Sequence, residues 1–318
     1  MTVQSPTRPT GREATQPVVR ARNGLKRGDT LPAVLGLGPA VTYMIALIGL
    51  PLLLVVYTSF TSVSISDPNV LGADFVGLAN YQTLAQDYLY RTALRNSVAF
   101  TLSSELIKIL LAVPLALLLM RNFRGRKIVR TLIILPYAVP AFIGALAWRW
   151  MLDSTYGLTD WLLVALNITD DPPVWLGEDR FAVASVIIVN IWHTLPLITV
   201  IVIAGLTSVP QELIDAAKVD GASAMRRLWH VMLPVMAPVV LVGQLFSFVF
   251  VFSELSIVYI LTRGGPGAAT EILPTAAFRT AIVNGQLGLG SAVGLLMVPV
   301  MALVAWLLLR FMGRGEEK

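Results

Sequence analysis

Cysteine is absent from the sequence, and histidine occurs only twice, at His193 and His230. The absence of cysteine excludes a disulfide, a thiolate metal site and a cysteine nucleophile. Two histidines so far apart in the chain argue against a histidine-rich metal centre. We therefore expect neither a metal site nor a catalytic residue in this chain.

Charged residues are also scarce. They make up 14% of the 318 residues, against about 25% in a soluble globular protein. Hydrophobic residues make up 56%, so a membrane protein is the first interpretation. The net charge of +5 could suggest nucleic acid, but the positions of the basic residues indicate membrane topology instead, and we expect no nucleic-acid partner.

Long apolar segments predict an all-α, polytopic membrane protein. Each spanning helix needs about 20 mostly apolar residues. Six segments meet this requirement: residues 31–60, 96–120, 131–152, 181–206, 235–262 and 287–312. We therefore expect a transmembrane domain over residues 31–312. It follows a disordered polar tail, residues 1–30, and precedes a short C-terminal tail, residues 313–318.

Lysine and arginine predict the orientation of these spans. One side collects 17 of the 24 basic residues, in the N-terminal tail, the second-to-third connection, the fourth-to-fifth connection and the C-terminus. The other side has 6, and Lys108 lies within a span. This bias predicts that both termini and the stretch 208–234 are cytoplasmic.

The stretch 208–234 reads as two short helices joined at a glycine. Ser208 and Gln211 match a capping box, and Gly221 is placed to end the first helix. A second amphipathic helix follows and is expected to stop at Pro234. Physical chemistry alone leaves two roles equally open for this hairpin: association with membrane lipids or docking to another protein.

The letters "DAAKVDGASAMRRLWHVMLP" favour docking, because they resemble the EAA motif of ABC importer permeases. The resemblance implies a cytoplasmic coupling hairpin that contacts a separate ATPase subunit. The positions that correspond to this contact are Asp215, Ala216, Ala217, Asp220, Gly221, Leu233 and Pro234. Asp215 stands where the motif usually has glutamate.

Further segments are similar to the sugar-importer branch, which includes maltose-type and glycerol-phosphate-type permeases. They are "FVGLANYQTL", "ILPYAVP", "IIVNIW", "LTRGGPG" and "GLGSA", in this order along the chain. The resemblance implies a bacterial inner-membrane subunit that pairs with a second permease as a heterodimer. It also implies an ATPase dimer and an extracytoplasmic sugar-binding protein or lipoprotein as partners.

Polar side chains inside the spans mark a candidate substrate pathway, because such residues are costly in lipid. In the sugar-importer branch the site lies midway across the membrane. The resemblance carries this site onto Asn190, His193, Thr194, Ser247, Phe250 and Glu254. Glu105 and Lys108 lie three residues apart and are expected to form a structural pair or a cavity wall. Glu254 would repel an anion, so a neutral sugar or oligosaccharide is favoured over glycerol phosphate.

The chain has no G-x-x-x-x-G-K-[ST] loop, which would bind the phosphates of ATP. We therefore expect no cofactor and no enzyme activity in this chain, and we expect ATP and magnesium to bind the partner ATPase.

A proton-coupled secondary transporter using Glu105, His193 and Glu254 is an alternative, but it leaves the hairpin unexplained. An ABC permease for glycerol phosphate is another. A membrane enzyme acting through Asp170 and Asp171 is disfavoured, because no base, nucleophile or metal set accompanies them.

Overall fold

A computed structural model describes residues 30–70 and 72–313, and these residues are helical throughout their membrane segments. No named strand occurs in this part of the chain; one isolated antiparallel bridge joins Thr61 and Phe75. The chain divides into two compact units at Leu52 and Leu53. The N-terminal tail that the sequence predicts to be disordered lies almost wholly outside the described residues.

The first span consists of α1 (Thr30–Met44), a π-helical turn η1 (Ile45–Gly49) and α2 (Leu50–Thr58). It is long and apolar enough to cross a membrane over Gly36–Thr58. A short helix, α3 (Ala79–Gln86), leads into α4 (Tyr88–Met120). The second span is predicted to start at residue 96, but α4 starts at Tyr88, because the Asp87 side chain accepts from Leu89 N at 2.7 Å and caps the helix.

The third span is broken. It consists of α5 (Arg126–Ala138) and α6 (Ala141–Met151), which meet at an angle of 99°. The sequence predicts one span over residues 131–152. Pro140 removes a helical donor and pushes Val139 to an extended conformation with ψ of 131°, so the helix ends there and a new one begins.

The connection between the third and fourth spans, which the lysine and arginine bias predicts to be the outer one, carries α7 (Leu158–Ala165), and the fourth span is α8 (Asp179–Thr207). The hairpin follows, with α9 (Gln211–Val219) and α10 (Ala224–Arg227). The prediction that Pro234 ends the second hairpin helix is wrong. A π-helical turn η2 (Leu228–Met232) lets the helix continue into α11 (Leu233–Phe252) and, past a short break, α12 (Ser256–Leu261).

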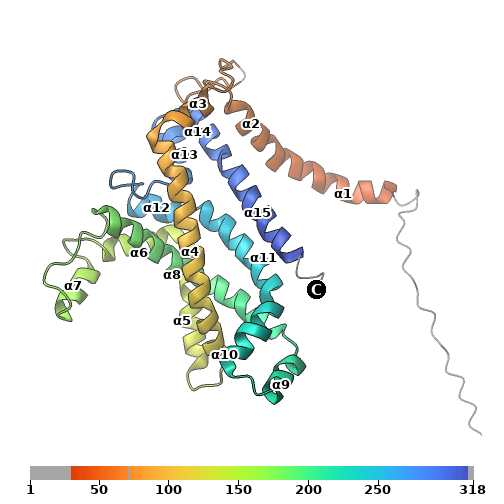
Figure 1. Cartoon of the computed structure of the whole chain (residues 1–318). Helices are drawn as coiled ribbons and strands as arrows, with labels where there is room; N and C mark the ends of the chain where they lie inside the picture. The colour runs from red at the N-terminus through yellow and green to blue at the C-terminus, as the bar shows by residue number, and fades with distance from the viewer. Residues whose placement is uncertain (1–29, 71, 314–318) are drawn as a thin grey trace, which may run out of the picture. The chain divides into compact units, whose positions relative to one another are not determined.

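The chain ends with α13 (Leu273–Phe278), the turn η3 (Arg279–Val283), α14 (Leu287–Leu295) and α15 (Met297–Gly313). Five described segments are long and apolar enough to span a membrane, or six with the bent α5–α6 pair counted as one span. This confirms the all-α polytopic fold. Within the second unit, α4 packs along α8, and α8 packs against α11 (Figure 1).

Small residues allow α4 and α8 to approach closely. Ala112 and Ala116 of α4 are fully buried and lie in one cluster with Ile198 and Val202 of α8. Nearer the N-terminal ends of both helices, Phe100 of α4 lies in a second cluster with residues of α8. This shared core holds the polar residues of α4, α8 and α11 in fixed positions.

Candidate functional site

A cavity of about 190 Å³ lies where α5, α8 and the end of α11 come together. It is lined by Tyr137, His193, Thr194, Leu197, Ser247, Phe250, Val251 and Glu254. Five of the six residues expected at the substrate site therefore line one cavity. We call it the substrate cavity below, after the expectation that these residues carry.

The break between α5 and α6 shapes one wall of the substrate cavity. Because residue 140 is a proline, the Pro136 carbonyl lacks its regular helical donor, and it accepts from Val139 N at 3.4 Å and from His193 Nδ1 at 3.0 Å. Since a carbonyl can only accept, the hydrogen is on Nδ1, and Nε2 is left for other partners. The Tyr137 ring lies 6.0 Å from the imidazole, centroid to centroid, so tyrosine and histidine come from two helices to form one wall.

The opposite wall depends on the break between α11 and α12. The helix is interrupted after Phe252, and Glu254 lies in the interruption. Glu254 Oε1 accepts from the Ile257 backbone N at 2.9 Å, which satisfies one of the free donors at the start of α12. The break therefore holds the carboxylate at the cavity instead of letting it follow a regular helical face.

A buried polar network lies directly behind Ser247. Lys108 Nζ donates to Glu105 Oε1 at 2.7 Å and to Ser247 Oγ at 2.8 Å. Ser247 Oγ donates to the same Glu105 oxygen at 2.9 Å, and Gln244 Nε2 donates to the other. The predicted pairing of Glu105 with Lys108 is confirmed, and the pair ties α4 to α11 next to the cavity.

Asn190 is the expected site residue that does not line the cavity. It is fully buried inside the helical bundle, and neither its amide oxygen nor its amide nitrogen has a hydrogen-bond partner among the described residues. Its backbone carbonyl accepts from Thr194 Oγ1 at 2.7 Å. The Asn190 backbone therefore holds Thr194 in place from one helical turn away, and the Asn190 side chain is not among the residues that line this cavity.

Three lining residues were missed from the sequence: Tyr137, Leu197 and Val251. Leu197 and Val251 are apolar residues in apolar helices, and nothing in the sequence distinguishes them from their neighbours. Tyr137 could have been found, since it stands between the two prolines of "ILPYAVP", and prolines are a common cause of a bend in a helix.

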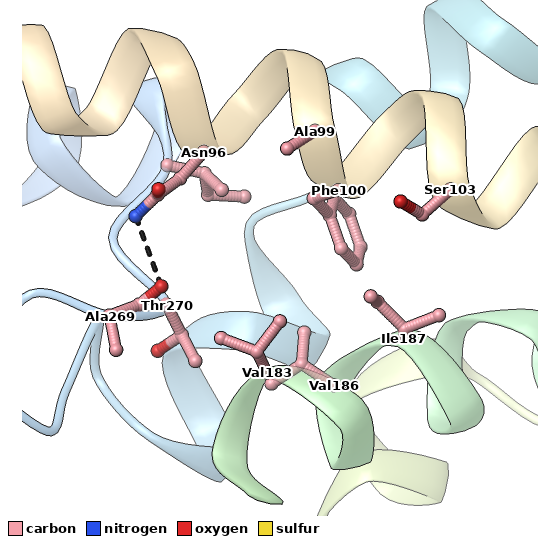
Figure 2. A pocket seen from close by; sticks show the side chains of 10 residues that line it. Asn96, Ala99, Phe100, Ser103, Val183, Val186, Ile187, Ala269 and Thr270 are labelled. Atoms are coloured by element: carbon pink, nitrogen blue, oxygen red, sulfur yellow. Dashed lines mark hydrogen bonds between the residues drawn. The ribbon is translucent and has the colours of Figure 1, made fainter. Parts of the chain in front are cut away.

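A second cavity, of about 110 Å³, lies between α4, the first half of α8 and the loop that precedes α13 (Figure 2). Its walls are mostly apolar, with Phe100, Val183 and Val186 among them. Asn96 Nδ2 donates to the carbonyl oxygens of Ala268 and Ala269, each at 3.0 Å, and fastens the loop to α4. With so few polar groups, this cavity suits loop packing better than recognition of a polar molecule.

The hairpin adopts the two-helix form that its sequence predicts, and Gly221 ends α9 with φ of +76°. The predicted capping box is absent. Ser208 Oγ donates back to Gly205 O of α8 at 2.8 Å, and Pro210 precedes α9 without a side-chain cap. The reason is that Ser208 still belongs to the end of α8, whose last carbonyls compete for its hydroxyl.

The residues that resemble the coupling motif fall into exposed and buried groups. Asp215 is exposed, while Ala217 is buried in the hairpin. The Lys218 ammonium and the Gln211 amide donate to Asp215 at 2.7 and 3.0 Å and hold the pKa of that carboxyl below its ordinary value. Ala216 O accepts from the Asp220 backbone N at 3.0 Å and closes the last turn of α9.

The other two motif residues, Leu233 and Pro234, lie in the continuous helix that enters the membrane domain. A movement of the hairpin would therefore pass directly into α11, the helix that carries Ser247 and Phe250. Among the described residues, no group of three or more histidine, aspartate or glutamate side chains could hold a metal ion.

The family model described as "Binding-protein-dependent transport system inner membrane component" matches residues 108–314. The chain belongs to this family. It is the permease subunit of an ABC importer. Members of this family are inner membrane components of binding-protein-dependent transport systems, and the spanning helices make the permease a multi-pass membrane protein.

The permease is 35% identical to the trehalose/maltose transport system permease protein MalF of Thermococcus litoralis, over 70% of this chain and 74% of that protein. It is 30% identical to the trehalose transport system permease protein SugA of Mycobacterium tuberculosis, over 95% of each chain. Its fold resembles a bacterial ABC transporter for import of the acidic polysaccharide alginate, with a TM-score of 0.75 at 19% identity, over 90% of this chain and 96% of that one.

Proposed function

We propose that the permease forms half of the translocation pathway for a neutral sugar or oligosaccharide. The observation that carries this proposal is the charge of the substrate cavity. Among the residues that the structure describes, no lysine or arginine lines it, and Glu254 is the only acidic residue that does. A phosphorylated or sulfonated substrate would need cationic side chains, which bind such groups through charge-assisted hydrogen bonds.

The nearest buried cation, Lys108, does not alter this balance, because Glu105 neutralises it at 2.7 Å. Tyr137 and Phe250 add flat aromatic faces, which suit the C–H surfaces of sugar rings. Relatives named for trehalose and maltose transport agree with a neutral sugar.

The energy for transport is supplied by partner subunits in this proposal. The sequence has no phosphate-binding P-loop, so ATP and magnesium bind an ATPase dimer that docks on the hairpin. A second permease completes the pathway as a heterodimer, and an extracytoplasmic binding protein or lipoprotein delivers the sugar. Both termini are cytoplasmic, as the distribution of lysine and arginine indicates.

Uptake in cells that express the complete importer tests the proposal. Radiolabelled trehalose, maltose and glycerol 3-phosphate are offered separately, before and after ATP depletion and with a protonophore. We expect uptake of a neutral sugar that survives the protonophore and stops without ATP. The substitution Glu254→Ala should weaken that uptake, while Asp170→Ala on the outer connection serves as the control. Uptake of glycerol 3-phosphate alone would overturn the substrate class.

A further inference from the structure

Ser247, Thr194 and His193 of the substrate cavity donate their side-chain hydrogens to other protein groups. Ser247 Oγ donates its single hydrogen to Glu105 Oε1 and accepts from Lys108 Nζ. A serine hydroxyl has one donor and two acceptor positions, so one acceptor position remains. Glu105 and Lys108 are buried and fix this arrangement from behind the cavity wall.

The two polar residues of α8 show the same pattern. Thr194 Oγ1 donates to Asn190 O, which leaves its lone pairs for a ligand. His193 uses its Nδ1 hydrogen on the Pro136 carbonyl, and Nε2 of the neutral imidazole is an acceptor. Both residues therefore face the cavity as hydrogen-bond acceptors.

Glu254 contributes a carboxylate, which can only accept. One of its oxygens already accepts from Ile257 N, and the remaining positions are available. Among the described lining residues, Tyr137 is the single side chain whose donor hydrogen has no partner within the protein. Four polar groups thus offer acceptors, and one hydroxyl can donate.

We propose that the substrate cavity recognises its ligand as a hydrogen-bond donor, with Glu105 and Lys108 as the residues that hold Ser247 in its accepting orientation. This inference rests on the proposed function, since it takes the cavity as the substrate site. A ligand with several hydroxyl or ammonium groups can satisfy the acceptors. A phosphate, sulfonate or carboxylate offers only hydrogen-bond acceptors. Its oxygens would face the acceptor groups of the cavity, and neither would find a donor.

The absence of cysteine allows a test that does not depend on the identity of the sugar. Phe250→Cys places the only thiol of this chain at the cavity, and Leu78→Cys places a control thiol at an exposed position before α3. The detergent-solubilised complete importer is treated with three methanethiosulfonates. These carry an aminoethyl group (a cation with N–H donors), a trimethylammonioethyl group (a cation without them) or a sulfonatoethyl group (an anion). Labelling of this chain is followed by mass spectrometry.

Each labelling rate at Phe250→Cys is divided by the rate of the same reagent at Leu78→Cys. After this correction, we expect Phe250→Cys to react at least about tenfold faster with the aminoethyl reagent than with the sulfonatoethyl reagent. It should also react several-fold faster with the aminoethyl than with the trimethylammonioethyl reagent, since one hydrogen bond changes affinity by roughly tenfold. Equal rates for the two cations would show that charge alone is recognised and would overturn the proposal. So would a preference for the anion, or no labelling at the cavity while the control reacts.

The role of Glu105 and Lys108 has its own readout. The paired substitution Glu105→Met with Lys108→Met removes both charges together and frees the Ser247 hydrogen to turn toward the cavity. In the Phe250→Cys background, we expect the preference for the aminoethyl over the trimethylammonioethyl reagent to fall by about half or more. An unchanged preference in a folded variant would overturn the positioning role. If the paired variant does not assemble, the reagent series on Phe250→Cys alone still decides the main proposal. Sugar uptake is measured separately, so a failed labelling pattern is distinguishable from a wrong transport function.

Discussion

Lys108 Nζ lies 2.7 Å from Glu105 Oε1, one helical turn earlier on α4, and both side chains are buried. Lys108→Met leaves the Glu105 carboxylate buried without its cation. Loss of one partner from a buried ion pair costs about 3–5 kcal/mol, so we expect a loss of this order in the free energy of unfolding. Unfolding of the purified importer by SDS titration measures it.

The paired variant Glu105→Met with Lys108→Met is the matched control for this prediction. It removes both charges, so no uncompensated ion is left in the core, and stability should recover most of the loss. A single Lys108→Met variant as stable as the unchanged protein would contradict a buried, mutually dependent pair.

Val219 is an apolar residue at the end of α9 and is 89% exposed, more than any other large hydrophobic residue of the hairpin. If the ATPase subunit covers this position, Val219→Asp buries a carboxylate without a partner. Such a group costs about 1–3 kcal/mol, so we expect roughly tenfold less ATPase to co-purify with the permease. Val174→Asp, on the outer connection, is the control for the same substitution at another exposed valine. Equal ATPase recovery from both variants would remove Val219 from the docking surface.

Gly221 adopts a φ of +76°, a conformation that glycine reaches without strain. A Cβ atom added there would meet nothing within 4 Å, so the cost of a substitution comes from the backbone alone. We expect uptake to decrease in the order Gly221, Gly221→Asn, Gly221→Ala, because asparagine tolerates this conformation better than alanine. Gly221→Pro should abolish uptake, since proline cannot adopt a positive φ.

Initial uptake rates, normalised to the amount of membrane-inserted permease, measure this series. The comparison of alanine with asparagine is the informative one, because both add a side chain but only one fits the backbone. An alanine variant that transports as well as the asparagine variant would show that the turn at Gly221 is not rigid during transport.

The spans and the hairpin could be predicted because they depend on long, local patterns. Apolar runs of about 20 residues and the lysine and arginine bias identify them without knowledge of packing. The 99° bend between α5 and α6 could not be predicted in the same way. Pro140 indicates that a break is possible, but the angle of the break depends on what packs around it, including His193, which donates to the Pro136 carbonyl.

The substrate cavity was predictable in part for the same reason. Polar residues in an apolar helix stand out, so His193, Ser247 and Glu254 were found. Asn190 also stands out, yet it faces the packed interior and not the cavity. The sequence shows that Asn190 is a polar residue in an apolar helix. The direction in which its side chain points depends on how α8 is rotated against α4, which only the packed structure shows.

Asp215 accepts from Lys218 and Gln211, and these donors lower the pKa of its carboxyl. A group with a lowered pKa in the folded state contributes stability above its unfolded pKa and loses it as pH falls through the folded value. The contribution is therefore fully present at neutral and mildly acidic pH, and it disappears only below the ordinary range of aspartate. We expect the ATPase activity of the importer to show the same pH profile with Asp215 and with Asp215→Asn between about pH 5.5 and 8.

ATPase activity measured across this pH range, for the unchanged importer and for Asp215→Asn in parallel, checks this expectation. Asp215→Glu provides the second comparison, because it keeps the charge and restores the longer side chain that the motif usually has. A profile that differs between Asp215 and Asp215→Asn within this range would mean that the carboxyl titrates near neutrality, against the direction that its two donors impose.

Asn96 fastens the loop 262–272 to α4 through two hydrogen bonds to backbone carbonyls, one of which is drawn in Figure 2. Ser97 adds a third connection by accepting from Leu273 N at 2.7 Å, at the start of α13. In Asn96→Ala the carbonyls of Ala268 and Ala269 lose their shared donor, at a net cost of about 1 kcal/mol for each bond. Local opening of the loop should then become roughly tenfold or more frequent, and amide hydrogen exchange in peptides covering residues 262–272 should accelerate accordingly.

Ser103→Ala is the control: it alters another polar residue of the same cavity and should leave this exchange unchanged. If both variants exchange at the rate of the unchanged protein, the loop is held by its own backbone and the apolar contacts around Phe100, and the Asn96 bonds contribute orientation without stability.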